Sequence, residues 1–375
     1  MSEERVFMER ALFLAAQGRG RTSPNPMVGA VVVKQGSVVG EGYHLRAGGD
    51  HAEVIALRGA EDSAIGATLY VSLEPCCHCG KTPPCTERII DSGIRRVVAS
   101  MPDPNPLVCG KGFERLREAG IEVEWGLMEE ESSSLNEAYI KFIATGMPFV
   151  ILKGAASLDG KIATATGESR WITGPAARER VHRLRDEVDA VMVGIGTVLQ
   201  DDPQLTTRLA SGQGKDPLRI ILDAEARLPL NAKVINPASL SGTLLVTSNS
   251  SPREKLEDLR RQGVEVWAME EQEGRIPLRP LLKGLGERKI VSLMIEGGSE
   301  INASALEEGV VDKVILFVAP RLIGGASAPS WIGGQGIERL DESFTLKNIF
   351  LERLGDDIMI EGRLQPPTRI PCSPA

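Results

Sequence analysis

Histidine, glutamate and cysteine residues suited to metal chemistry stand close together in the first quarter of the chain. His51 and Glu53 are two residues apart, and four cysteines lie between positions 76 and 85. A catalytic zinc site needs three nitrogen or thiolate ligands, a fourth position open to water, and a carboxylate that carries protons without occupying the metal. His51, Cys76 and Cys85 can supply the ligands, and Glu53 the carboxylate. The pattern therefore predicts a zinc-dependent hydrolase.

The order of these residues indicates which bond such a site attacks. Zinc deaminases carry His-x-Glu followed by Pro-Cys-x-x-Cys, and their activated water attacks an amine-bearing carbon while the glutamate acts as general acid and base. Here eight residues separate Cys76 from Cys85, and Cys79 stands at the two-residue spacing of the signature. Cys79 and Cys85 therefore compete as third ligand. Pro83-Pro84 favours Cys85, because prolines begin helices and a helix N-terminus lowers a thiol pKa.

Other uses of the same residues compete with this interpretation. One is a structural zinc with four protein ligands and no open position, which leaves Glu53 without a role. Its ligands would come from Cys76, Cys77, Cys79, Cys85 and either His51 or His78. A deaminase of nucleic-acid bases is disfavoured by the acidic charge and by an aromatic content of 4%. A zinc-stabilised nucleotide sensor is disfavoured by Glu53 beside an open site.

Length and composition predict a globular protein of two domains. The chain has 375 residues, which is longer than a domain with one hydrophobic core usually is. Its 42% hydrophobic and 25% charged residues are typical of a globular protein. The net charge of -8 argues against broad nucleic-acid binding, which requires a basic surface. The apolar runs are too short for a signal peptide or a membrane span. Four of the six cysteines cluster, so we expect metal binding in a cytoplasmic protein rather than disulfides.

Hydrophobic periodicity predicts an α/β layer over residues 1–145. The expected helices are Glu3–Gln17, His51–Gly59, Pro83–Ser92, Gly110–Ala119 and Glu129–Thr145. The expected strands are Met27–Val33 and Val38–Tyr43, which form a hairpin, then Ala67–Leu73, Arg95–Met101 and Ile121–Trp125. Gly146-Met147-Pro148 breaks the last helix and marks the domain boundary.

A second α/β pattern fills residues 146–367, and residues 368–375 form a tail. Its expected strands are Phe149–Ala156, Ala190–Val193, Leu218–Asp223, Thr243–Thr247, Val264–Ala268, Ile290–Glu296 and Lys313–Ala319, with two antiparallel edge strands within Thr345–Leu364. The usual dinucleotide fingerprint Gly-x-Gly-x-x-Gly is missing. Two glycine turns, Gly194-Ile195-Gly196-Thr197 and Glu296-Gly297-Gly298-Ser299, follow strands and precede helices, so they could cradle phosphates.

Four segments of the first half form a specific combination. They are Thr22-Ser23-Pro24-Asn25-Pro26-Met27-Val28-Gly29-Ala30, His51-Ala52-Glu53, the block from Glu74-Pro75-Cys76 to Thr82-Pro83-Pro84-Cys85, and Asp103-Pro104-Asn105-Pro106. Together they resemble the deaminase half of the bifunctional riboflavin-biosynthesis deaminase/reductase family. The resemblance implies a cytidine-deaminase-like α/β/α domain that binds one Zn²⁺ through His51, Cys76 and Cys85, with Glu53 as proton carrier. It also implies a diaminopyrimidinone ribosylamine 5'-phosphate as substrate, contacted by Asn25, His44 and Lys81.

The second half resembles the reductase half of the same family through the two glycine turns and the segments 153–161, 169–173 and 201–206. The resemblance implies a dihydrofolate-reductase-like α/β domain that uses NADPH to reduce the ribosyl group to ribityl. The residues implied to face the dinucleotide are Ala155, Trp171, Thr197, Asp201, Gly297, Gly298 and Ser299. The residues implied to face the substrate are Lys153, Ser169, Arg185, Leu205, Arg208 and Glu296.

The chemistry of the reductase step suits these residue types. The ring-opened ribosylamine is an imine, which accepts the hydride. Lys153 and Glu296, each at the end of an expected strand, could make a polar contact with this imine or supply its proton. Arg185 and Arg208 could bind the 5'-phosphate. Ser248 is a candidate contact for the 2'-phosphate of NADPH. We expect a homo-oligomer with a small phosphorylated pyrimidine as its partner, and neither nucleic acid nor membrane.

Overall fold

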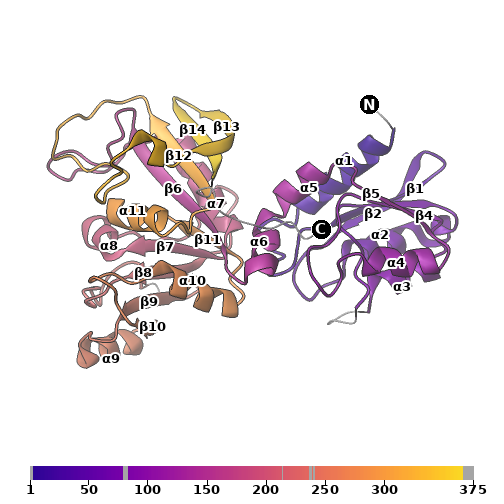
Figure 1. Ribbon diagram of the computed structural model, residues 1–375, viewed down its shortest axis with the longest axis horizontal. Coiled ribbons are helices and arrows are strands. Elements are labelled where there is room, and N and C mark those ends of the chain that lie inside the picture. Colours follow the sequence, from indigo (N-terminus) through magenta and orange to yellow (C-terminus); the bar gives the residue numbers. More distant parts are fainter. Residues whose placement is uncertain (1–2, 79–82, 213, 236–238, 240, 366–375) are drawn as a thin grey trace. The chain divides into compact units, whose positions relative to one another are not determined.

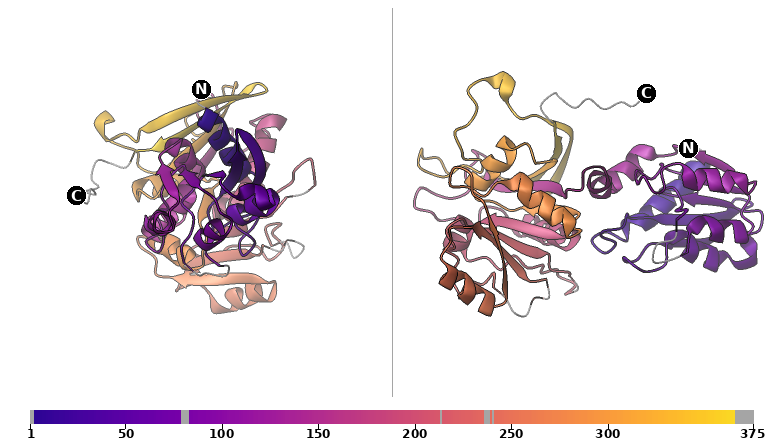
Figure 2. Two further views of the ribbon diagram at one scale, coloured as in Figure 1. Left: turned by 90° about the vertical axis from the view of Figure 1, so that its right-hand side faces the viewer. Right: turned by 60° about the horizontal axis from the view of Figure 1, so that its bottom comes forward.

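The structure, a computed structural model, describes residues 3–78, 83–212, 214–235, 239 and 241–365. The chain divides into two compact units, Met1–Met147 and Pro148–Ala375, whose elements are labelled in Figure 1 and seen from two further directions in Figure 2. The predictions for Cys79, Lys81 and the tail lie outside the described residues. Within the described ranges, no helix is long and apolar enough to cross a membrane.

The first unit is built on a five-stranded sheet in the order β2-β1-β3-β4-β5. β1 (Gly29–Lys34) and β2 (Ser37–Tyr43) form the expected hairpin, and β1 also pairs antiparallel with β3 (Thr68–Val71). β4 (Arg96–Ala99) and β5 (Glu122–Trp125) then follow β3 in parallel. The carboxyl ends of β3 and β4 therefore meet at one edge of the sheet, where the segment that carries Cys76 begins.

Side-chain alternation along β1 divides the core of this unit into two layers. Ala30 and Val32 pack in one cluster with residues of α2 (Ala52–Ala60), α3 (Cys85–Asp91) and α4 (Lys111–Glu118). The intervening Val31 and Val33 pack in a second cluster with Met8, Ala11 and Leu14 of α1 (Glu3–Ala16). Helices therefore cover both faces of the sheet, as expected for an α/β/α domain.

Two predicted elements of this unit were wrong in their bounds, for one shared reason. The helix expected over Glu129–Thr145 is two helices, α5 (Glu129–Leu135) and α6 (Glu137–Thr145). They are separated at the buried Asn136, whose amide accepts a hydrogen bond from Met27 N–H (2.8 Å) and donates one to the Met27 carbonyl (3.0 Å). This pairing occupies the Met27 backbone, so β1 begins at Gly29 instead of Met27.

The second unit contains a nine-stranded sheet in the order β10-β9-β8-β7-β11-β6-β12-β14-β13. Its first seven strands along the chain are parallel to one another and confirm the predicted ones, with ends that differ by at most two residues. They are β6 (Phe149–Ser157), β7 (Ala190–Gly194), β8 (Leu218–Leu222), β9 (Thr243–Ser248), β10 (Val264–Met269), β11 (Ser292–Ile295) and β12 (Lys313–Ala319). The predicted antiparallel edge is also present, as β13 (Leu346–Leu354) and β14 (Asp357–Leu364).

The connections of this sheet run in opposite directions from two neighbouring strands, β7 and β11. From β7 the chain passes through α8 (Ile195–Asp201) to β8, and from β11 it passes through α11 (Ser299–Glu307) toward β12 on the other side. Because such crossovers are right-handed, α8 and α11 leave the sheet on opposite faces. A crevice opens at the carboxyl ends of strands where the direction reverses, and ligands of open α/β sheets bind there.

The remaining helices of this unit complete the covering of the sheet (Figure 1). They are α7 (Pro175–Glu187), α9 (Arg253–Arg261) and α10 (Leu278–Glu287). The largest buried cluster joins α7, α8 and α9 to residues of β7, β8 and β9, including Val191, Ile221 and Leu245. These strands are mostly apolar and buried on both faces, as is usual for parallel strands covered by helices.

Candidate active sites of the two units

The first turn of α2 presents an imidazole and a carboxylate toward the cysteine segment. His51 precedes the helix with an extended backbone (φ -75, ψ 160), and its side chain makes no capping hydrogen bond. The imidazole is therefore free to face the cysteines, and its Nδ1 lies 3.1 Å from Cys85 Sγ and 3.6 Å from Cys76 Sγ. Glu53, two residues further on, is 4% exposed.

Cys76 and Cys85 are brought together because α3 begins at Cys85. The Thr86 N–H donates to the Cys76 carbonyl (3.2 Å), and the Cys85 N–H donates to Cys76 Sγ (3.4 Å). One ligand atom from each of His51, Cys76 and Cys85 lies within 4.8 Å of the other two, which is the only such cluster among the described residues. The rival Cys77 lies apart from it, with its Sγ 3.9 Å from the Leu107 carbonyl.

Hydrogen bonding sets the charge of the cysteine pair. The Cys85 thiol and His51 lower the pKa of the Cys76 thiol to about 4. The hydrogen bond to Cys76 and burial raise the pKa of Cys85, which keeps its proton. Hydrogen bonding to Cys76 also raises the pKa of His51. A thiolate, a thiol whose proton a cation can displace, and an imidazole form a donor set of three protein ligands that fits zinc.

Glu53 lies beside this donor set in a water-poor environment. Burial, followed by the negative charge of Cys76, raises the pKa of Glu53 to about 7. A carboxyl group that titrates near neutrality can both take up and return a proton at working pH. The geometry therefore suits the general acid and base predicted for this position.

His44 and Asn25 form a hydrogen-bonded pair next to His51. His44 Nδ1 lies 3.0 Å from the Asp50 carbonyl, which can only accept, so Nδ1 carries a proton. Burial lowers the pKa of His44, so the ring is neutral and its Nε2 accepts from the Asn25 amide at 3.1 Å. The His44 ring meets the His51 ring edge-on at 5.3 Å. Both predicted contacts thus lie at the metal site, with the Asn25 carbonyl oxygen not used in this pair.

Glu74 supports this site, although its role was missed in the sequence. One carboxylate oxygen accepts the N–H groups of Asp103 (3.1 Å) and Gly110 (3.0 Å), and the other those of Gly112 (2.9 Å) and Phe113 (3.3 Å). Glu74 is 3% exposed. It therefore ties the segment that leads to Cys76 to the start of α4. An acidic residue directly after a buried strand was the available signal.

The second unit holds a cavity of about 1380 Å³ at the carboxyl ends of β6, β7, β8 and β11. All residues predicted to face dinucleotide or substrate line this one cavity. They are Lys153, Ala155, Ser169, Trp171, Arg185, Thr197, Asp201, Leu205, Arg208, Glu296, Gly297, Gly298 and Ser299. Segments up to 146 residues apart in the chain are thus brought to the crevice that the reversal between β7 and β11 creates.

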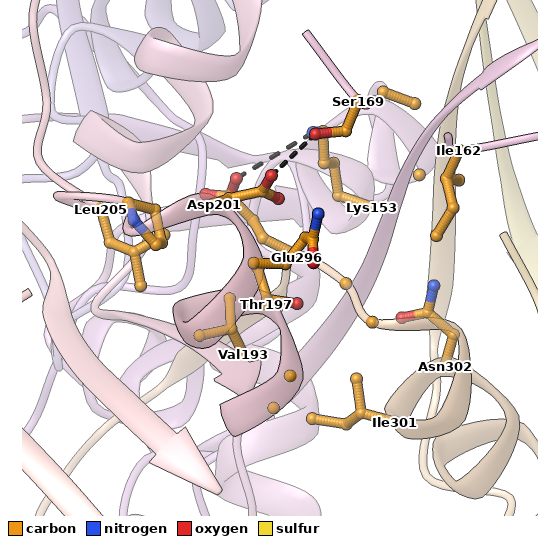
Figure 3. A pocket seen from close by; sticks show the side chains of 18 of the residues that line it. Lys153, Ile162, Ser169, Val193, Thr197, Asp201, Leu205, Glu296, Ile301 and Asn302 are labelled. Carbon is orange, nitrogen blue, oxygen red and sulfur yellow. Dashed lines mark hydrogen bonds and ion pairs between the residues drawn. The ribbon is translucent and has the colours of Figure 1, made fainter. Parts of the chain in front are cut away.

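Charged residues cluster in one part of this cavity, where Lys153, Ser169, Asp201 and Glu296 lie near one another in Figure 3. Arg185 binds Glu296 with two hydrogen bonds, of 2.6 and 2.8 Å, and Lys153 Nζ lies 4.0 Å from the same carboxylate. Burial raises the pKa of Glu296, but the attraction of Arg185 outweighs it, so the net pKa is lowered. Burial lowers the pKa of Lys153. Glu296 is therefore an anion held between two cations.

The other predicted residues surround this cluster. The Ser169 hydroxyl donates to Asp201 at 2.7 Å, as Figure 3 shows. Arg208 donates to the side-chain amide oxygen of Gln204 (3.1 Å) and to the Thr206 hydroxyl (2.7 Å). Trp171 is 61% exposed on the cavity wall, with the Arg178 guanidinium 4.6 Å from its ring.

The second of the two glycine turns requires glycine, and the two turns lie side by side. Gly297 and Gly298 have φ of 113° and 71°, a backbone region that side chains disfavour, and Gly298 precedes the first residue of α11. The Gly194 N–H bonds to the Gly297 carbonyl at 3.5 Å, which joins the turn before α8 to the turn before α11. Ser248, the candidate for the 2'-phosphate, is buried, bonds to Ser250 and does not line the cavity.

Comparisons with known families agree with this division. Residues 1–101 match the cytidine and deoxycytidylate deaminase zinc-binding region. Residues 148–360 match the RibD C-terminal domain. The predicted fold class, a cytidine-deaminase-like domain followed by a dihydrofolate-reductase-like domain, is confirmed.

Whole-chain relatives extend the match. The riboflavin biosynthesis protein RibD of Actinobacillus pleuropneumoniae is 46% identical over 95% of this chain and 94% of its own length. RibD of Escherichia coli strain K12 is 42% identical over 96% of this chain and 98% of its own. A structure of Acinetobacter baumannii RibD superposes with a TM-score of 0.87 at 40% identity, covering 97% of this chain and 99% of that one. The chain therefore belongs to the RibD family of riboflavin biosynthesis proteins.

Proposed function

We propose that this chain catalyses two successive steps of riboflavin biosynthesis: hydrolytic deamination of a phosphorylated diaminopyrimidine, then NADPH-dependent reduction of its ribosyl group. The observation that carries the proposal is the presence of both required sites in one chain. One is a three-donor metal site beside a buried carboxylate, and the other is a large cavity where the sheet connections reverse. A Thermotoga maritima structure that is 39% identical bears the name of this deaminase and reductase pair.

In the deaminase site, His51, Cys76 and Cys85 would hold the zinc ion. When bound, zinc supplies Lewis-acid activation of water near neutral pH. Glu53 takes the proton of the attacking water and returns one to the departing ammonia, as its raised pKa allows. His44 holds the Asn25 amide by accepting its N–H, so the Asn25 carbonyl oxygen is directed to an N–H of the pyrimidine. Lys81, outside the described residues, is a further proposed contact.

In the reductase site, NADPH supplies the hydride when bound. Thr197 and the turn Gly297-Gly298-Ser299 bind its phosphates at the starts of α8 and α11, while Ala155, Trp171 and Asp201 border it. On the substrate side, Arg208 binds the 5'-phosphate and Ser169 and Leu205 line the path to it. The second arginine predicted for that phosphate, Arg185, uses two of its N–H groups on Glu296. Its position fixes Glu296, and Lys153 is left as the proton source for the reduced nitrogen.

One experiment tests both steps together. The full chain receives the diaminopyrimidine substrate and NADPH, and ammonia release and NADPH oxidation are followed with and without chelation of zinc. We expect chelation to stop both signals. When the deaminated pyrimidine is supplied instead, chelation should leave NADPH oxidation unchanged. Ammonia release by the zinc-free protein would refute the deaminase mechanism, and no oxidation of NADPH with the deaminated substrate would refute the reductase.

The role of Glu53 has its own test. Glu53→Gln keeps the size of the side chain and removes its ability to carry a proton, so we expect a full zinc content and loss of deamination. His51→Ala and Cys85→Ala should instead lose zinc. Retained turnover in Glu53→Gln, or a stoichiometric zinc content in either ligand variant, would contradict these assignments.

We also propose that two copies of this chain associate, within the cytoplasm, through the edge strand β13. Ile349, Phe350 and Leu351 are 59, 56 and 62% exposed on this strand, whose outer backbone has no neighbour in the sheet order. An apolar, unpaired edge favours antiparallel pairing with a second copy. Phe350→Lys should lower the molar mass measured by light scattering after size exclusion, whereas Leu322→Lys, at a site 77% exposed elsewhere, should not. An unchanged mass for Phe350→Lys would refute this interface.

A further inference from the structure

The cavity of the second unit is lined by more basic residues than the substrate phosphate and the hydride transfer require. Most of them are committed to protein partners. Lys153, 4.0 Å from Glu296, is assigned to the proton transfer, and Arg185 holds Glu296 through two hydrogen bonds. Arg208 holds Gln204 and Thr206, and Lys233 lies 3.1 Å from Asp202. Arg178 donates to the Thr173 carbonyl at 2.6 Å and lies over Trp171, and Arg170 donates to the Asp201 carbonyl. Arg227 and Arg275 differ from this group.

Arg227 makes no short contact within the described part of the chain. Its Nε lies 3.7 Å from Asp223 Oδ1 and 3.5 Å from Glu225 Oε2, which is at or beyond the length of a hydrogen bond. Its side chain is 53% exposed and lines the cavity. The guanidinium thus lies within the field of two carboxylates, but its N–H groups remain available for a ligand.

Asp223 explains how this arginine is held. Its Oδ2 accepts the Leu228 N–H at 2.8 Å and so closes the loop that follows β8. Its Oδ1 is buried and has no hydrogen-bond partner among the described residues, and the nearest cation to it is Arg227. A buried carboxylate without full hydrogen bonding attracts a cation strongly. Asp223 therefore positions Arg227 in the loop that follows β8.

The place of Arg227 in the sheet matches the adenosine end of a dinucleotide. The loop after β8 adjoins the turn at Gly194, because β8 is the neighbour of β7 (Figure 1). A dinucleotide with its diphosphate on the two glycine turns and its nicotinamide beside Lys153 must extend toward β8. There Leu222, Ala224 and Ile276 offer apolar surface for a base.

Arg275 reaches the same cavity from the segment before α10. Its closest contacts are the Ser304 hydroxyl at 3.4 Å and two carboxylates, of Glu300 and Glu307, at 3.7 Å each. It lines the cavity next to Ile276 in the chain. Arg227 and Arg275 are thus two loosely held arginines of the cavity lining, whereas the other lining arginines make short contacts with protein partners.

We propose that Arg227 selects NADPH over NADH by binding the phosphate on the adenosine ribose, with Arg275 as a second contact. This rests on the proposed reductase function. Arginine binds a phosphate dianion through paired charge-assisted hydrogen bonds, which a ribose hydroxyl does not match. NADH lacks that phosphate, so it gains nothing from either arginine.

The test compares dissociation constants of NADPH and NADH for the full chain by fluorescence titration. Arg227→Gln should weaken NADPH about ten- to a hundredfold, the amount expected for lost charge-assisted hydrogen bonds, and leave NADH within about twofold. Arg275→Gln should show a smaller loss with the same selectivity. Arg261→Gln, on α9 outside the cavity lining and 70% exposed, removes the same charge and should change neither constant.

The outcomes separate this inference from the function on which it rests. Unchanged NADPH affinity in Arg227→Gln, or equal weakening of both dinucleotides, overturns the assignment of Arg227 while the reductase function stands. If the unsubstituted chain binds neither dinucleotide, the reductase function itself is wrong. Selective loss of NADPH affinity, with NADH binding serving as the check on folding, supports the proposal.

Discussion

Removing the Glu74 carboxylate should destabilise the deaminase unit and disturb its metal site together. Its two oxygens accept four backbone N–H groups at 2.9–3.3 Å. Glu74→Ala leaves these donors without their partner in the interior. At about 1 kcal/mol for each lost bond, the unfolding free energy should fall by about 4 kcal/mol. For a unit of this size that corresponds to a melting temperature lower by about 8–16 °C.

Glu74→Gln refines this prediction, because it keeps the shape and one acceptor oxygen. Its amide group would face two N–H donors, so about half of the bonding is lost, or about 2 kcal/mol. The effect should extend to Cys76, because the segment is tightly packed: a Cβ on Gly112 would lie 2.1 Å from the Pro75 carbonyl oxygen. We therefore expect both variants to bind zinc more weakly.

Calorimetry of the full chain can resolve the two units as separate transitions, with zinc content measured on the same samples. Glu118→Gln is the matched control, since this residue lies exposed near the end of α4. The control should melt like the unsubstituted chain, and the reductase transition should not move in any variant. A melting temperature for Glu74→Ala within about 2 °C of the unsubstituted chain, an effect below about 1 kcal/mol, would refute the reasoning.

Three further predictions concern the metal, the buried ion pair and pH. Chelation of zinc should lower the melting temperature of the deaminase unit only, because the ion binds the folded form; a shift in both transitions would contradict this. Arg185→Met should lower the unfolding free energy of the reductase unit by about 3–5 kcal/mol, since it leaves Glu296 a buried, poorly compensated anion; in urea titrations a loss below about 1 kcal/mol would show the pair to be dispensable. Burial, with the charges of Arg185 and Arg208, lowers the pKa of His182 to about 4 from 6.5. As the pH falls, His182 therefore takes up its proton at a higher pH in the unfolded chain than in the folded one. The stability due to neutral His182 is present above pH 6.5 and is lost as the pH falls toward 4. Melting curves at pH 5 and 7 should differ less for His182→Gln than for the unsubstituted chain, and an equal difference would count against this.

The sequence predicted that His51, Cys76 and Cys85 lie together, because local structure places their side chains. His51 occupies the N-cap position of the helix whose first turn holds Glu53, and Cys85 begins another helix, so short-range patterns place their side chains. Glu74 could not be assigned a role in the same way. Its four partners lie 29 to 39 residues further along the chain, and only the folded loop brings their N–H groups to one carboxylate.

The helix break at Asn136 shows the same limit in the fold. The segment has the composition of one continuous helix, and propensity alone predicts it so. The pairing of the Asn136 amide with Met27, 109 residues away, ends the first helix and also delays β1. Tertiary hydrogen bonding therefore decided two element boundaries that local sequence could not.

The dinucleotide site illustrates why a missing motif did not mean a missing function. In the usual fingerprint, one glycine-rich turn supplies both the close approach and the helix N-terminus. Here we propose that two glycine turns about a hundred residues apart in the chain, Gly194–Thr197 and Gly297–Ser299, share this role, and the sheet order makes them neighbours. The hydrogen bond from Gly194 to Gly297 joins them. Because α8 and α11 leave the sheet on opposite faces, the two turns meet only where the sheet makes β7 and β11 neighbours, an arrangement that no single stretch of sequence could reveal.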